Sequence, residues 1–278
     1  MSGFDHLEFS GPDDPRTAPA QAPSGAHDAY RAARRMREAG HFQSAATLYQ
    51  RAIGFEERRY AAWIELVDCL VRGGDLDGAE HKASEALENY KQVRAFYAAR
   101  ALTLAHKGAI HAAWPLSDVS LEGGPDAYAM AVRAELLLRQ SPANHKPALE
   151  LLAEALRIAE APWDVCFAAG SMLLAANQAP LAAGYFSEAV HVKPRAAAAL
   201  IGLGDCFFRL RLYDQALFYY QQVTRMQPRH ETALNRQREC APKTFGLLRV
   251  FRRNDLQHIW NKRFERLTRK EELDAHDF

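Results

Sequence analysis

The feature that most constrains the fold of this chain is an internal repeat with a period of 34 residues. The stretch that ends at Pro194 aligns without a gap with the stretch that ends at Pro228. The aligned apolar and small positions are Cys166, Ala169, Gly170, Leu173, Ala182, Phe186, Ala189 and Pro194, which match Leu200, Leu203, Gly204, Phe207, Ala216, Tyr220, Val223 and Pro228. A chain built in this way needs no single large core, because each repeat packs on its neighbours.

The residue types within one repeat predict a pair of packed helices. Small residues such as Gly170 and Ala182 let two helices approach closely, and large residues such as Phe186 fill the volume around that contact. Pro194 lacks the N–H needed to continue a helix, so it ends the second one. Alanine is abundant while valine and isoleucine are scarce, which favours helices over strands. The sequence therefore predicts an all-α chain.

This pattern of small, large, aromatic and proline positions resembles the tetratricopeptide repeat (TPR) family. The resemblance implies a right-handed α-solenoid of about six helix-turn-helix repeats. In this register the solenoid spans 26–228, with repeats near 26–59, 60–92, 93–126, 127–162, 163–196 and 197–230. Two repeats fit less well: Arg100 occupies a small-residue position, and the turn at 141–146 carries about two extra residues, which costs little closure entropy.

The segments outside the repeats have distinct compositions. Residues 229–241 predict a capping helix with a polar outer face, and residues 1–25, which contain four prolines and few apolar residues, predict a disordered tail. Within the extension 242–278, the stretch from Lys243 to Lys270 holds nine basic and two acidic residues. Its apolar residues recur at helical spacing, which predicts a basic amphipathic docking helix with Arg252, Arg253, Leu256, Ile259, Trp260, Arg263, Phe264 and Leu267.

That helix has three possible roles. It can cover the open end of the solenoid, in which case its apolar stripe is core and its arginines face solvent. It can dock on a separate protein, as amphipathic helices often do. It can also bind a membrane surface or nucleic acid, because clustered positive charge is attracted to phosphate groups. The net charge of +1 for the whole chain weakens this last alternative.

In the TPR family, partners bind the concave surface formed by the first helix of each repeat. The candidate groove residues at these positions are Tyr30, Arg34, Ile64, Asp68, Arg94, Tyr97, Tyr128, Glu135, Phe167, Ile201, Asp205 and Phe208. Aromatic and arginine residues of this kind are typical of binding hot spots, although the aromatic rings could instead be buried between repeats. Family members that hold an Hsp70 or Hsp90 tail use a clamp of lysine, asparagine and arginine. Tyr30, Arg34 and Glu65 stand at those positions here, so we do not expect a chaperone tail as ligand.

The sequence contains none of the motifs that catalysis or cofactor binding requires. It has no phosphate-binding glycine loop, no H-E-x-x-H, no G-x-S-x-G and no paired cysteines, so we expect no catalytic activity, cofactor or metal. We expect a cytoplasmic protein-interaction scaffold, adaptor or assembly factor that binds a partner peptide or helix. The alternatives are a recruitment or regulatory module acting through the basic helix, and a permanent subunit of a larger complex.

Overall fold

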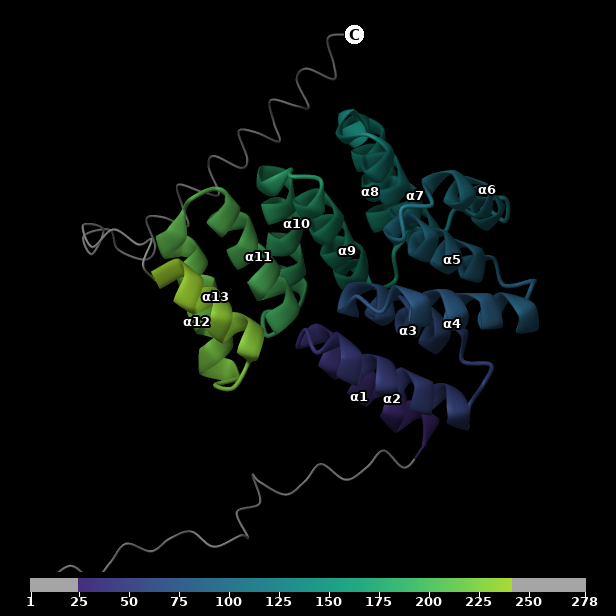
Figure 1. The fold of residues 1–278 in the computed structure, drawn as a ribbon, viewed down its shortest axis with the longest axis horizontal. Coiled ribbons are helices and arrows are strands. Elements are labelled where there is room, and N and C mark those ends of the chain that lie inside the picture. The colour runs from purple at the N-terminus through teal and green to yellow at the C-terminus, as the bar shows by residue number, and fades with distance from the viewer. Residues whose placement is uncertain (1–24, 242–278) are drawn as a thin grey trace, which may run out of the picture.

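The computed structural model describes residues 25–241, a range that contains thirteen α-helices, one short 3₁₀ helix and no strand (Figure 1). The all-α class expected from the sequence is thus confirmed for this range. The elements are α1 (Ala26–Glu38), α2 (Phe42–Phe55), α3 (Tyr60–Gly73), α4 (Leu76–Asn89), α5 (Arg94–His106), α6 (Ile110–Leu121), α7 (Ala127–Gln140), η1 (Pro142–Asn144), α8 (His145–Ile158), α9 (Pro162–Ala175), α10 (Ala179–Val192), α11 (Ala197–Arg209), α12 (Tyr213–Met226) and α13 (Glu231–Cys240).

Consecutive helices pack in pairs, from α1 with α2 to α11 with α12. The first helix of each pair begins within one residue of the start of one repeat of the sequence. The longer turn of the fourth unit contains η1, and α13 packs on α12 after the last pair. The expected tail and the expected docking helix between Arg252 and Leu267 lie outside the described residues.

The turn inside most pairs contains one residue in the left-handed region. Gly40, Gly74 and Gly108 have φ values of 82°, 83° and 84°, and their spacing is the repeat period. Asn177 and Arg211, with φ values of 63° and 61°, hold the equivalent places in the last two pairs. Glycine adopts this conformation without steric cost, whereas a residue with a Cβ atom is strained there. The backbone conformation of these turns therefore recurs from repeat to repeat, as the sequence pattern does.

The small positions of the repeat are sites of close contact between the two helices of a pair. A Cβ atom added to Gly170 would lie 2.8 Å from the ring of Phe186, and one added to Gly204 would lie 2.5 Å from the ring of Tyr220. Both rings are buried. Each aromatic side chain of a second helix thus lies directly against the backbone of the first, which only glycine permits at these places.

The array curls until its first pair of helices meets its last two pairs. Figure 1 shows α1 and α2 beside α9, α11 and α13, and contacts join α1 to α11. Lys193 Nζ donates to Glu38 Oε1 at 2.5 Å, across 155 positions of sequence. His230 Nε2 lies 2.8 Å from the carbonyl oxygen of Ala39 and donates to it, and its ring stacks on His41 at 4.8 Å. The first helices of the pairs therefore form an inner surface, and contacts between the two ends of the array cover part of it.

Candidate functional site

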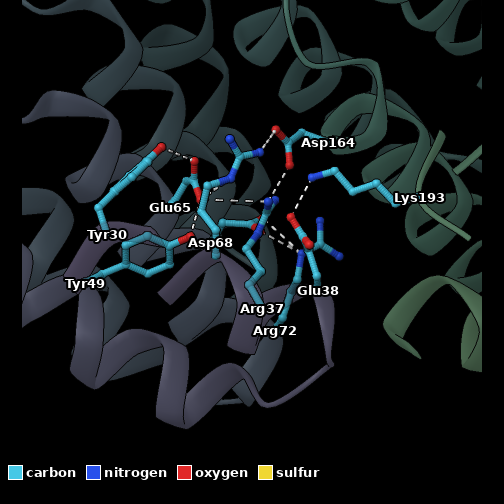
Figure 2. Close-up of polar contacts among 10 residues, drawn as sticks. Tyr30, Arg37, Glu38, Tyr49, Glu65, Asp68, Arg72, Asp164 and Lys193 are labelled. Atoms are coloured by element: carbon cyan, nitrogen blue, oxygen red, sulfur yellow. Dashed lines mark hydrogen bonds and ion pairs between the residues drawn. The ribbon is translucent and has the colours of Figure 1, made fainter. Parts of the chain in front are cut away.

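The centre of the inner surface is a network of charged side chains from α1, α3 and α9 (Figure 2). Arg37 on α1 is only 5% exposed. Its guanidinium donates to Asp68 Oδ2 on α3 at 3.2 Å and also pairs with Asp164 on α9. Arg34, one turn earlier, donates to Asp164 Oδ2 at 3.1 Å. These ion pairs join the first repeat to the fifth, and we call them, with Glu65 and Arg72, the central network.

Asp68 is held between two guanidinium groups. Arg72, four residues later on α3, donates from Nε to both carboxylate oxygens of Asp68 at 3.0 and 2.9 Å. Burial raises the pKa of Asp68, but the charges of Arg72 and Arg37 outweigh this effect, so the pKa lies below its ordinary value. Asp68 is therefore charged at neutral pH even though it is 5% exposed.

Glu65 completes the network on the side of the first repeat. Its carboxylate accepts hydrogen bonds from the hydroxyl of Tyr30, at 2.6 Å, and from the hydroxyl of Tyr49. Burial, followed by the negative charge of Glu65, raises the pKa of both tyrosines, so both remain protonated donors. The carboxylate also lies 3.9 Å from the guanidinium groups of Arg34 and Arg37.

A second buried carboxylate, Glu135 on α7, has its own partners. His106 Nε2 lies 2.7 Å from Glu135 Oε1, and Arg139 Nε donates to the same oxygen at 2.9 Å. Burial raises the pKa of Glu135, but the hydrogen bond and charge of His106, and then the charge of Arg139, outweigh it, so the pKa is lowered. The carboxylate of Glu135 is thus already bound by two side chains of the same chain, His106 and Arg139.

A pocket of about 470 Å³ lies beside the central network, between α3, α7, the turn before α9 and α9 itself. We call it the central pocket. Its polar lining beyond Arg37 consists of Glu65, Asp68, Asp126, Tyr128, Glu160 and Asp164. Its apolar walls include Ala61, Ile64, Ala127, Ala131, Val165 and Ala168. A cavity of this size, with apolar walls and a few polar groups, is typical of ligand sites.

A second pocket, of about 400 Å³, lies between α9, α11 and the turn that joins α1 to α2. We call it the lateral pocket. Its lining includes Phe42, Phe167, Leu174, Ile201, Asp205 and Arg209. The rings of Phe42 and Phe167 lie 6.3 Å apart, and the guanidinium of Arg72 lies 4.9 Å from the centre of the Phe167 ring. The lateral pocket is thus mostly apolar and is bounded by the contact between the first and fifth repeats.

The structure brings most of the expected groove residues to this surface. Ile64, Asp68 and Tyr128 line the central pocket, and Phe167, Ile201 and Asp205 line the lateral pocket. Within this set the side chains of Asp68, Phe167 and Ile201 are buried, and so is that of Glu135. Arg34 belongs to the central network, and Tyr30 donates a hydrogen bond to Glu65 of that network.

Six expected groove residues lie outside both pockets: Tyr30, Arg34 and Glu135, which are described above, and Arg94, Tyr97 and Phe208. Arg94 is exposed and donates to the carbonyl oxygen of Val119 and to Glu122. Tyr97 packs against the cluster around Trp63, and Phe208 packs edge to face on Tyr213 at 5.4 Å.

Sequence reasoning missed Asp164, which holds both arginines of α1. A local signal existed, because Asp164 lies one turn before Phe167 on the same helix face.

Two possible features are missing from the part of the chain that the structure covers. Between residues 25 and 241 no helix has the length and apolar character needed to span a membrane. In the same range, no group of three or more histidine, cysteine, aspartate or glutamate side chains is arranged to hold a metal ion. The four cysteines are free and buried.

The profile of the Tetratricopeptide repeat family matches residues 30–93 and 167–235. The chain is therefore a tetratricopeptide repeat protein. Proteins of this family generally act as protein-interaction scaffolds without catalytic activity.

Several solved structures resemble the chain. YrrB, described as a TPR protein with an unusual peptide-binding site, is 19% identical over 68% of this chain and 97% of its own, with a TM-score of 0.42. A thermophilic TPR protein of Thermus thermophilus is 14% identical over 78% of this chain and 99% of its own, with a TM-score of 0.45. PilF of Pseudomonas aeruginosa is 18% identical over 78% and 97%, with a TM-score of 0.45. No curated protein matches the sequence.

Proposed function

We propose that this protein is a non-catalytic scaffold, adaptor or assembly factor that binds a peptide or helix of a partner protein on its inner surface. The observation that carries this proposal is the presence of two pockets: the central pocket, which is lined partly by the central network, and the lateral pocket, which is lined by Phe42 and Phe167. Each pocket combines apolar walls, which gain free energy when a partner covers them, with charged groups that orient the partner.

The central network supports this role by holding the pocket walls in place before a partner arrives. Arg37, Asp68 and Asp164 are fixed by ion pairs to two or more neighbours, so little side-chain entropy remains to be lost on binding. A preorganised surface of this kind binds more tightly than a flexible one of equal area.

The same contacts support excluding a chaperone tail as the ligand. Such a tail ends in a carboxylate and needs free cationic donors. Tyr30 binds Glu65 and Arg34 binds Asp164, so these positions are occupied by partners within the chain. The four free cysteines fit a reducing compartment, and we place the protein in the cytoplasm.

The proposal is tested by affinity capture with the full chain and three variants. Ala61→Arg fills the central pocket, Ser171→Arg fills the lateral pocket, and Gln50→Arg adds the same side chain at an exposed position outside both pockets. We expect a partner that is retained by the wild type and by Gln50→Arg and is lost from one or both pocket variants. Equal retention by all four proteins would show that the inner surface is not the binding site.

A shortened chain that ends at Ala241 tests the alternative of recruitment through the basic extension. If partners bind the inner surface, they remain bound to the shortened chain. Loss of every partner on shortening would instead assign binding to residues 242–278.

A further inference from the structure

The central pocket retains unbalanced negative charge after its internal ion pairs are counted. Three of its carboxylates face guanidinium groups of α1 and α3: Glu65, Asp68 and Asp164 lie within ion-pair distance of Arg34, Arg37 or Arg72. The remaining two, Asp126 and Glu160, are exposed at the rim. Among the described residues neither forms an ion pair, and Asp126 accepts only the backbone N–H of Ala129, at 2.7 Å.

An independent observation is the hydroxyl of Tyr128, a residue that contributes to the lining of the same pocket. This hydroxyl is buried and has no hydrogen-bond partner within the described residues. Burial, followed by the nearby charge of Asp68, raises the pKa of Tyr128 well above its ordinary value, so the group stays neutral. A buried hydroxyl without a partner is unfavourable, and a ligand that supplies an N–H donor would satisfy it.

The walls of the pocket fit a long aliphatic stem. Ala61, Ala127, Ala131 and Ala168 are small, and Ile64 adds a broad apolar surface. Arginine and lysine both bury their methylene groups along such walls while the charged end remains at a polar rim. Of these two, arginine offers five N–H donors in a planar fork, which can serve a carboxylate and a hydroxyl together.

We propose that the central pocket binds an arginine side chain of the partner peptide, with its stem on the alanine-rich walls and its guanidinium at the rim carboxylates. This inference rests on the proposed function and specifies the chemistry of its ligand. In this arrangement the carboxylates of Glu160 and Asp126 bind the positive charge of the guanidinium, and the hydroxyl of Tyr128 accepts an additional hydrogen bond from it.

The test uses the full chain labelled with nitrogen-15 and three small probes in NMR titrations. The probes are N-acetyl-arginine methylamide, its lysine counterpart, and its citrulline counterpart, which has nearly the same shape as arginine without the charge. We expect the arginine probe to shift the amide signals of residues 126–131 and 158–168 in a saturable manner. Citrulline lacks the charge of arginine, and lysine lacks its planar fork of donors. Each should bind about tenfold or more weakly, since one hydrogen bond to a charged group contributes roughly that factor.

Variants separate recognition from a general effect on the fold. Glu160→Gln and Tyr128→Phe should each weaken arginine binding, whereas Glu88→Gln, at an exposed position of α4, should leave it unchanged. The spectra also report whether each variant is folded. Absence of saturable shifts with arginine, or equal binding of citrulline, would overturn the inference. If arginine binding is absent but Ala61→Arg still abolishes partner capture, the proposed function stands and only the inference of an arginine ligand fails.

Discussion

Replacing Arg37 with methionine is expected to destabilise the protein by about 3 kcal/mol. Removing one member of a buried ion pair typically costs about 3–5 kcal/mol, because the remaining charge is left without its partner. The lower end of this range applies here, because in the variant Asp68 still forms an ion pair with Arg72, and Asp164 still forms one with Arg34. Methionine preserves most of the stem that packs near Trp163, where the guanidinium lies 5.3 Å from the ring centre.

The assay is urea unfolding of a double-mutant cycle made of Arg37→Met, Asp164→Asn and the combined variant. The side chain of Asp164 is 28% exposed, so its single variant should cost less, about 1–2 kcal/mol. The two changes should be coupled by about 1–2 kcal/mol, because both remove the same contact. A loss below about 0.5 kcal/mol for Arg37→Met, or changes that simply add, would refute the view that this ion pair holds the first repeat to the fifth.

Three further predictions concern the repeats and their closing contact. Gly204→Ala should destabilise by about 1–3 kcal/mol in urea unfolding, because its Cβ would lie 2.5 Å from the Tyr220 ring; an unchanged midpoint would argue against this close contact. Arg211→Gly should leave stability equal or raise it by up to about 1 kcal/mol, because glycine relieves the left-handed strain at φ 61°; a clear loss would contradict that account. Burial, followed by the charge of His230, lowers the pKa of His41 in the folded protein. As the pH falls, His41 is therefore protonated in the unfolded chain before it is protonated in the folded one. The free energy of unfolding should consequently fall as the pH drops below about 6.5, the ordinary pKa of histidine. His41→Gln should flatten this slope between pH 7.5 and 5, where Asp68 and Glu135, with lowered pKa values, remain charged.

The fold could be predicted from the sequence because the repeat records local contacts. Gly170 and Gly204 indicate where a first helix meets the aromatic ring of a second helix, and the structure places Phe186 and Tyr220 there. These contacts join residues 16 positions apart within one unit, so the sequence of a single repeat is enough to indicate them. Their physical cause, close packing of a large ring against a small residue, is the same in the last two units.

The closing contact could not be predicted from the repeat pattern. It depends on the sum of small rotations between successive repeats, and no single position encodes that sum. Arg37 and Asp164 are 127 positions apart, and each has the character of an ordinary exposed charge in its own helix. The same reason explains why Asp68 and Glu135, which the repeat pattern places on a partner-binding surface, are buried: the pattern gives the face of a helix but not what covers that face.

Site-specific photo-crosslinking would test the account most directly. A photoreactive benzoylphenylalanine at Ala61, which is exposed and lines the central pocket, is compared with the same group at Gln50 in cells of the native host. We expect a crosslinked partner from position 61 and not from position 50, with the site of attachment in the partner next to an arginine. Crosslinks of equal yield from both positions, or from position 50 alone, would contradict binding on the inner surface.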